Sequence, residues 1–188
     1  MSSKEQLIDK IKELQINHSN SLLEYWFRFS FINTWQFWLF FALLIIPLIA
    51  IYKLIDKKRA MLIGFFGFNV HVWFTYMDLI GGSRNFWFYP YKVVPFLPTS
   101  FPLDVSFVPV CYMFFYQWTL HRKKNYYLYM LVLCMLLSFV FEPILVMLGL
   151  IELNKGTTYF HLLLGYTSVA LISKIITNIF IKFENISK

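Results

Sequence analysis

The chain has 188 residues, of which 59% are hydrophobic and only 14% are charged. A soluble domain carries about 25% charged residues and about 45–50% apolar ones, so this composition excludes an ordinary water-soluble fold and favours a bilayer as the solvent. The net charge of +7 is typical of contact with anionic headgroups. Because no basic stretch is long, we expect no nucleic-acid partner.

The first segment, residues 1–30, has the pattern of an amphipathic helix. Leu7, Ile11 and Leu14 recur at helical spacing, and charged residues surround them. Such a helix lies on a membrane surface or packs against a partner protein. A solvated leader helix is the alternative interpretation.

Five apolar stretches follow, and each approaches or exceeds the length of helix that crosses a bilayer, which is about 20 residues. They occupy residues 31–52, 60–77, 104–120, 127–150 and 159–181. We therefore predict an all-α fold, a polytopic membrane helical bundle of about five transmembrane helices. Residues 31–182 would form this bundle as a single domain, preceded by the N-terminal amphipathic helix.

Residues 79–103 differ from the apolar stretches in composition. Four prolines, at positions 90, 95, 98 and 102, exclude a regular helix, and the many aromatic residues predict a structured loop at the membrane interface. Basic residues gather instead at 53–59, at 121–124 and at the C-terminal end. The positive-inside rule places these three on the cytoplasmic side of the cell membrane, with the N-terminus and the proline-rich loop outside.

Five ionisable residues stand out, because charge inside a bilayer is costly. Glu142 interrupts its stretch about ten residues from the outer end, which is about 15 Å deep at the rise of a helix. His71 and Asp78 share one helix face, Asp104 begins the third stretch and His161 begins the fifth. Each also has a structural interpretation: a neutral carboxyl for Glu142, a helix cap for Asp104, and packing or interface positions for the other three.

Together these side chains predict an outward-facing polar pocket that aromatic residues of the proline-rich loop cover. Its candidate ligand-binding residues are His71, Asp78, Asp104, Glu142 and His161. Glu142, Asp78 and Asp104 are also the candidate catalytic acids. Carboxylates and imidazoles can bind divalent metals, but no HExxH-like signature accompanies them, so we predict no metal site. The sequence identifies no cofactor.

Four segments give the chain a resemblance to a family of small, functionally unassigned, polytopic membrane proteins of spore-forming Gram-positive bacteria. They are GFFGFNVHVWFTYMD at 64–78, YPYKVVPFLPTSFPLDVSFVPV at 89–110, YQWTLHRKKNYYLYM at 116–130 and FEPILV at 141–146. The resemblance runs from about Tyr25 to the C-terminus. It implies a host and a membrane topology, and it implies no mechanism.

A looser similarity is to the integral-membrane lycopene cyclases. Those enzymes have an intramembrane Asp, a Trp-containing loop, and a Leu-Pro followed by an acidic residue and a Phe. The residues in the same order here are Asp78, Trp87, Leu97, Pro98, Asp104 and Phe107. In the cyclases the carboxyl groups protonate a polyene. This chain departs from the pattern, because the acidic pair that directly follows the cyclase proline is absent and Asp104 comes after a second proline.

The sequence leaves three hypotheses on function open. The first is an accessory membrane protein that binds a membrane lipid, a partner membrane protein or a second copy of itself. The second is an intramembrane enzyme that acts on an isoprenoid or lipid by acid catalysis. The third is a transporter or channel subunit, which would need an oligomer because a lone transporter usually has internal repeats.

Overall fold

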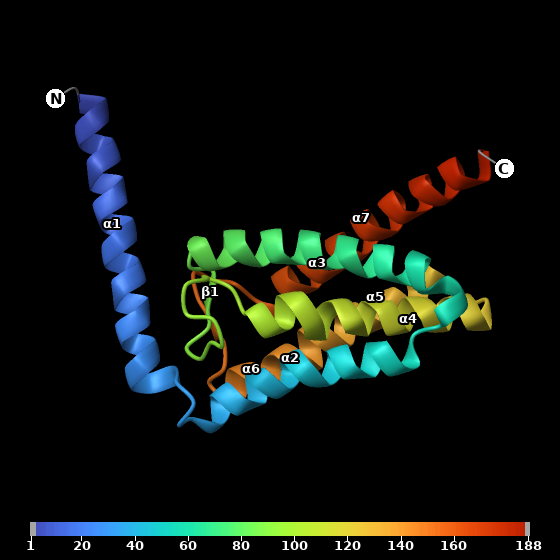
Figure 1. The fold of residues 1–188 in the computed structure, drawn as a ribbon, viewed down its shortest axis with the longest axis horizontal. Helices are drawn as coiled ribbons and strands as arrows, with labels where there is room; N and C mark the ends of the chain where they lie inside the picture. The colour runs from blue at the N-terminus through green and yellow to red at the C-terminus, as the bar shows by residue number, and fades with distance from the viewer. Residues whose placement is uncertain (1–2, 187–188) are drawn as a thin grey trace.

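The computed structural model describes residues 3–186, and it is almost entirely helical (Figure 1). Its α-helices are α1 (Ser3–Tyr25), α2 (Trp35–Leu54), α3 (Ala60–Ser83), α4 (Val108–Arg122), α5 (Tyr126–Leu136), α6 (Glu142–Met147) and α7 (Tyr159–Ile186). Three π-helical turns and one 3₁₀ turn extend them: η1 (Trp26–Ser30), η2 (Lys57–Arg59), η3 (Leu103–Phe107) and η4 (Leu137–Phe141). The short strands β1 (Trp87–Phe88) and β2 (Glu152–Leu153) pair antiparallel.

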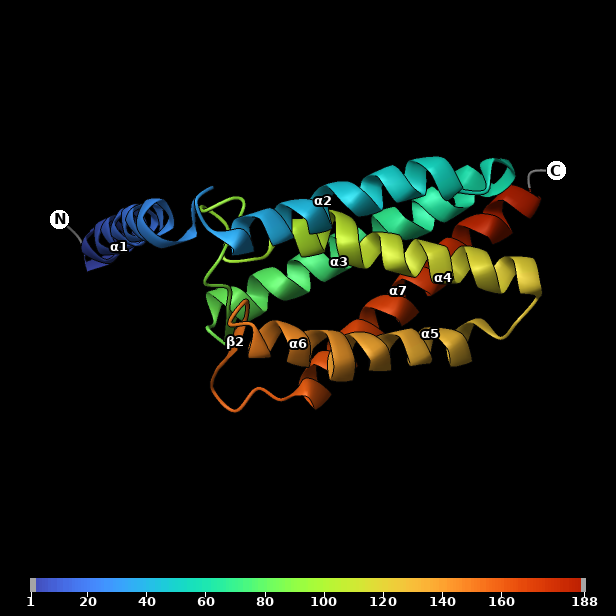
Figure 2. The same ribbon diagram turned by 90° about the horizontal axis from the view of Figure 1, so that it is seen from below.

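Five helical segments run back and forth along one axis to form the bundle (Figures 1 and 2). In chain order they are α2, α3, η3 with α4, α5 with η4 and α6, and α7. We call one end the basic end, because it holds Lys57, Lys58, Arg59, Arg122, Lys123 and Lys124. The opposite end, called the loop end, holds the proline-rich loop, the paired strands and the loop 148–158 (Figure 2).

The outer surface of the bundle is apolar along its length. Ile46 on α2, Phe68 on α3 and Ile175 on α7 are 64%, 62% and 56% exposed. Within residues 3–186, four helices are long and apolar enough to cross a membrane, by length and composition. Large exposed apolar area is typical of a surface that contacts lipid. The all-α membrane bundle predicted from the sequence is confirmed.

The remaining segment of the bundle, η3 with α4, lies at its centre. It packs against α2, α3 and α5, and its residues Tyr112 and Tyr116 are only 0% and 1% exposed. The two elements together reach about 30 Å at the helical rise, which is the thickness of the hydrocarbon core. Because its side chains meet other helices, this segment needs fewer apolar residues than the four that face outward.

Proline explains two of the π-helical turns. Pro109 and Pro143 stand two residues after the ends of η3 and η4, in the first turns of α4 and α6. Proline lacks an N–H, and its ring clashes with the carbonyl four residues earlier. The chain accommodates this with a wider turn, in which the Glu142 N–H donates to the Leu137 carbonyl. Such turns are frequent at functional sites, and here one contains Asp104 and the other precedes Glu142.

Two of the helix boundaries that differ from the prediction affect the site. α3 continues to Ser83, so the proline-rich loop begins at residue 84 and not at 79, because the two glycines of this region remain helical. The helix that carries Glu142 ends at Met147, not at residue 150. Glu142 therefore lies about 7.5 Å from that end at the helical rise, which is half of the predicted depth.

The N-terminal helix α1 lies outside the bundle. It runs across the loop end, whereas the other helices run along the bundle axis (Figure 1), and none of its residues is buried. The following turn η1 attaches it through Trp26, whose indole N–H donates to the Lys92 carbonyl at 2.7 Å. The apolar residues Leu7, Ile11 and Leu14 of α1 are 59%, 49% and 59% exposed, so this helix still lacks a surface to cover them.

Candidate functional site

Three carboxyl side chains from distant parts of the sequence gather near the loop end of the bundle. Asp78 comes from α3, Asp104 from η3 and Glu142 from the start of α6, and they are only 2%, 2% and 3% exposed. We call them the carboxyl cluster. Burying an unpaired carboxylate is costly, and within the described residues no lysine or arginine forms an ion pair with any of the three. Hydrogen bonds and protons must therefore stabilise the cluster.

Asp78 is held by the proline-rich loop. The Trp87 indole N–H donates to its Oδ1 at 2.5 Å, the Tyr89 phenol donates to the same oxygen at 3.0 Å, and the Ser100 backbone N–H donates to Oδ2 at 3.2 Å. Trp87 and Tyr89 are two residues apart in extended chain, so they point to the same side. Burial and the nearby carboxylates raise the pKa of Tyr89 well above its usual value, so its phenol remains a donor.

Gly81 makes room for Trp87. A Cβ atom at this position would overlap the Trp87 indole, and one at the neighbouring Gly82 would overlap the Pro98 carbonyl. The two glycines thus let the loop pack directly on the last turn of α3. The pairing of β1 with β2 then joins this loop to the loop 148–158. As a result, aromatic side chains cover the carboxyl cluster at the loop end.

Glu142 and Asp104 make the remaining contacts of the cluster. The Tyr166 phenol on α7 donates to Glu142 Oε1 at 2.5 Å. The Asp104 carboxyl group lies next to the Asp78 carboxyl group and the Thr99 hydroxyl. A hydrogen bond between two carboxyl groups requires a proton on one of them, because an ionised carboxylate only accepts. A hydrogen bond within the Asp78–Asp104 pair would therefore need a proton on one of the two groups.

A small cavity lies inside the cluster. Asp78, Glu142 and the aromatic residues bonded to them line it, and its volume is about 20 Å³. That space holds one water molecule, and it is far too small for a lipid or an isoprenoid. Glu142 Oε2 and Asp104 Oδ1 have no hydrogen-bond partner among the residues that the structure describes. The cluster thus combines unused acceptors with a space the size of water.

The two candidate histidines lie apart from this cavity. His71 Nδ1 is 2.8 Å from the Asp104 carbonyl oxygen and 3.3 Å from the Thr75 hydroxyl, so it joins α3 to η3. His161 is exposed, and its Nδ1 accepts from the N–H and the hydroxyl of Thr158 at the start of α7. The structure thus brings three of the five candidate residues together, places His71 beside them and leaves His161 at the surface.

Three residues that contact the cluster were not predicted, namely Tyr166, Thr99 and its neighbour Ser100. Tyr166 was missed although a buried tyrosine hydroxyl needs a partner, and this rule applied to α7 would have found it. Thr99 lies in the irregular loop, where no periodicity shows which way a side chain points. Trp87 and Tyr89 were expected only as aromatic residues of the loop, without specific partners.

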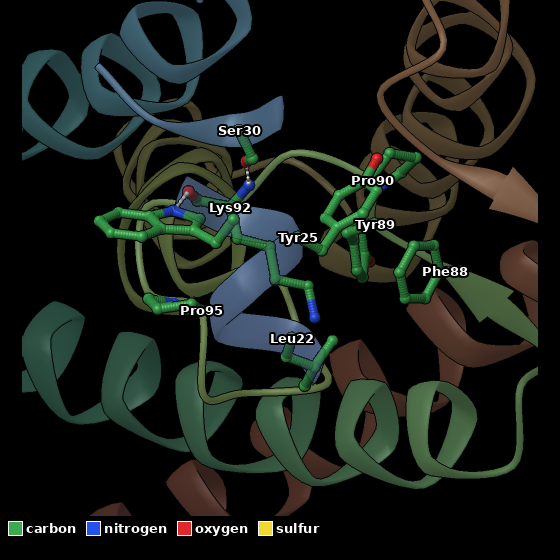
Figure 3. Close-up of a pocket in the computed structure, with 9 residues that line it drawn as sticks. Leu22, Tyr25, Ser30, Phe88, Tyr89, Pro90, Lys92 and Pro95 are labelled. Atoms are coloured by element: carbon green, nitrogen blue, oxygen red, sulfur yellow. Dashed lines mark hydrogen bonds between the residues drawn. The ribbon is translucent and has the colours of Figure 1, made fainter. Parts of the chain in front are cut away.

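A second site lies beside the cluster, between the proline-rich loop and α1. Lys92 is 6% exposed, and its backbone N–H donates to the Ser30 hydroxyl at 2.9 Å. Its ammonium group donates to the Leu97 carbonyl at 2.6 Å and lies 5.4 Å from the centre of the Phe88 ring. Figure 3 shows the Lys92 side chain extending toward Leu22 of α1.

Lys92 also lines a groove of about 590 Å³, which we call the Lys92 groove. α1 contributes His18 and Leu22 to its walls, α3 contributes Ser83, and the loop contributes Phe96. The lining therefore combines one cation and several uncharged polar groups with apolar side chains. That combination suits a molecule with a polar and an apolar part.

Burial lowers the pKa of Lys92 to about 8, and the attraction of the Asp78 carboxylate opposes this effect. The ammonium group therefore carries its charge at neutral pH but loses its proton more readily than that of an exposed lysine. Its hydrogen-bond partner, the Leu97 carbonyl, is neutral. An anion in the Lys92 groove would thus meet a positive charge that no ion pair within residues 3–186 neutralises.

Fold and sites together define a helical membrane bundle with a closed carboxyl cluster and an open basic groove next to it. Comparisons with protein-family models, with curated proteins and with solved structures found no match to this chain. The function is therefore inferred from the geometry of these two sites.

Proposed function

We propose that this chain is a multi-pass protein of the cell membrane that binds the headgroup of an anionic lipid in the Lys92 groove. The observation that carries the proposal is the buried ammonium group of Lys92, which lines an open groove and has a neutral hydrogen-bond partner. A phosphate is the complementary ligand, because hydrogen bonds between charged groups are about twice as strong as neutral ones. His18 and Ser83 add polar groups, and Phe88 and Phe96 add apolar surface.

Size favours the Lys92 groove over the carboxyl cluster as the lipid site. Sites for small molecules have volumes of about 300–1,000 Å³, and the Lys92 groove, at about 590 Å³, falls in this range. The cavity of about 20 Å³ in the cluster does not. From the sequence, we expected the lipid site at the acidic residues. We place it instead in the Lys92 groove, which lies beside them.

The position of α1 supports a lipid occupant. His18 and Leu22 face the groove, and Leu7, Ile11 and Leu14 belong to the same helix face, because the spacings are three or four residues. The apolar face of α1 is thus turned toward the side on which the bundle lies. α1 runs across the end of a membrane-spanning bundle, so the side of α1 that faces the bundle also faces the bilayer. Amphipathic helices bind bilayers through such an apolar face.

The charge distribution supports an orientation. Short loops rich in lysine and arginine remain on the cytoplasmic side, which assigns the basic end to the cytoplasm and the loop end, α1 and the Lys92 groove to the outer surface. Trp35 and Trp38 near the loop end and Trp118 near the basic end are 55%, 54% and 40% exposed. Exposed tryptophans at both ends fit the aromatic belts at the two membrane interfaces.

Native mass spectrometry of the purified protein tests the proposal, with phosphatidylglycerol and phosphatidylcholine of matched acyl chains as probes. We expect preferential retention of phosphatidylglycerol, reduced about tenfold in Lys92→Gln, because a hydrogen bond to a charged group contributes about 1.5–3 kcal/mol. Glutamine preserves a donor for the Leu97 carbonyl. Lys155→Gln is the matched control, since the exposed Lys155 ammonium also donates to a backbone carbonyl, that of Arg84, at 2.8 Å.

Retention in the Lys155→Gln protein should equal that of the wild type. Equal retention of the two lipids by the wild type, or equal losses in the two lysine variants, would overturn the proposal.

A further inference from the structure

The carboxyl cluster is separate from the Lys92 groove, and packing alone does not explain it. Glu142 Oε2 and Asp104 Oδ1 are buried without a hydrogen-bond partner among the described residues. An unsatisfied buried acceptor costs about 1–3 kcal/mol, and a charged one costs more. Glu142 is 3% exposed and lines the cavity of about 20 Å³. A hydrogen-bond donor in that cavity would satisfy its free oxygen.

The side-chain donors around the cavity are already used. Trp87 and Tyr89 donate to Asp78, and Tyr166 donates to Glu142. The missing donor must therefore be a small molecule or a proton on one of the carboxyl groups. One water molecule fits the volume, and a protonated carboxyl group carries an O–H donor of its own.

We propose that the carboxyl cluster is a proton-binding site, in which Asp78 and Glu142 share a dissociable proton through a water molecule held in the cavity that both line, with Asp104 as the third acid of the cluster. A transfer within the site breaks one O–H bond as it forms another, so it needs no further reactant. Carboxyl groups at this proximity titrate as one unit. The proposal stands on the cluster alone and does not depend on lipid binding at the Lys92 groove.

The titratable groups that face the cluster from other parts of the fold supply too little positive charge to balance three carboxylates. His71 of α3 bonds to the Asp104 carbonyl, while Tyr89 of the loop and Tyr166 of α7 donate neutral hydrogen bonds. Lys92 of the loop is a cation whose charge acts on Asp78. If all three carboxyl groups were ionised, the one cation and the neutral hydrogen bonds would not balance their charge. Buried negative charge would then be left unpaired.

Trp87 marks the route by which the proton exchanges with the outside. Its indole lines the cavity and also the wall of a second groove, of about 310 Å³, which contains His161 and Lys155. Displacement of this one side chain would join the cavity to that groove. His161 is exposed there. This gives His161 a place on the route although it lies outside the cluster.

Infrared difference spectroscopy with exchange from H₂O to D₂O detects protonated carboxyl groups directly. At neutral pH we expect a protonated-carboxyl C=O band from the wild-type protein that moves to lower wavenumber in D₂O. Glu142→Gln and Asp104→Asn, which nearly preserve side-chain shape, should remove or shift this band. Glu152→Gln, which changes an exposed carboxyl group in β2, is the control and should leave the band unchanged.

Two results would overturn the assignment. One is the absence of such a band at neutral pH in the folded wild-type protein. The other is loss of the band when sodium ions are added at constant pH, which would make the cluster a cation site. If the carboxyl variants do not fold, Tyr166→Phe supplies the test, because removing its hydrogen bond should move the Glu142 contribution to higher wavenumber.

The route is tested by the rate of the same isotope exchange. Trp87→Ala should accelerate exchange of the carboxyl band severalfold, because it opens the wall between the cavity and the outer groove. Phe86→Ala changes a residue that lines only the outer groove and should leave the rate unchanged. Equal rates in the wild-type and Trp87→Ala proteins would contradict the route.

Discussion

Tyr166 on α7 and Glu142 on α6 are joined by a hydrogen bond of 2.5 Å from the phenol to Oε1. Both residues are buried, at 2% and 3% exposure. The bond connects α7 to the helix that a proline and a π-helical turn interrupt. It holds one oxygen of the Glu142 carboxyl group, whereas the other oxygen has no hydrogen-bond partner among the described residues. It is therefore the contact that positions Glu142 within the carboxyl cluster.

Tyr166→Phe is expected to lower the free energy of unfolding by about 1–3 kcal/mol, because it leaves a buried acceptor unsatisfied. Denaturant unfolding in detergent micelles, followed by circular dichroism, measures the change. Tyr127→Phe alters an exposed tyrosine and should have no measurable effect. Equal effects of the two substitutions would show that the bond to Glu142 contributes no stability.

Gly81→Ala is expected to destabilise the loop end by about 1–3 kcal/mol, as overpacking commonly does, because the added Cβ overlaps the Trp87 indole. Tryptophan fluorescence should also shift to longer wavelength as Trp87 moves into water. Gly64→Ala is the matched control in the same helix, since nothing lies near its added Cβ. Alanine favours a helix by up to about 1 kcal/mol, so this control should be neutral or stabilising. The packing of the loop on α3 is refuted if the two variants behave alike.

Binding of anionic lipid should weaken as pH rises above about 8, the value to which burial lowers the pKa of Lys92. Below this pH the side chain is a cation, and above it the amine is neutral. Because binding is linked to this one proton, affinity for phosphatidylglycerol should fall by up to about tenfold per pH unit above the pKa. Lys92→Gln should give a profile without this decline. Parallel profiles for the two proteins would exclude Lys92 as the titrating group.

The bundle could be predicted because long apolar stretches between basic loops carry the information directly. The end of the Glu142 helix could not, because residues 148–151 are as apolar as the helix itself. Gly149, with φ of +67°, ends that helix through its backbone conformation, which hydropathy does not register. The same limitation applies to Gly81, which looked like the start of a loop and is part of α3.

The acidic residues of the site could be predicted from the sequence because each is an ionisable residue in or beside an apolar stretch. Their convergence depends on the rotation of each helix about its own axis, which composition does not determine. His161 was selected by the same rule, but it lies in the first turn of α7, where it bonds to Thr158 and remains exposed. The Lys92 groove could not be derived at all, since it exists only through the position of α1 beside the loop.

The orientation is tested by labelling single cysteines, in a chain that also carries Cys111→Ala and Cys134→Ala. A membrane-impermeant maleimide should label Glu152→Cys at the loop end in intact cells, and it should label Lys124→Cys at the basic end only after lysis. The reverse order of labelling would invert the proposed topology, and labelling of both in intact cells would show that the bundle does not separate two compartments.

Photocrosslinking tests the central claim, that an anionic lipid headgroup occupies the Lys92 groove, most directly. Benzoylphenylalanine at position 96 would lie in the groove, and at position 68 it would lie on the outer apolar surface of α3, where Phe68 is 62% exposed. In bilayers with equal amounts of phosphatidylglycerol and phosphatidylcholine, position 96 should capture mainly phosphatidylglycerol, and position 68 should capture both equally. Equal capture of the two lipids at position 96, or capture of a protein there, would contradict the account.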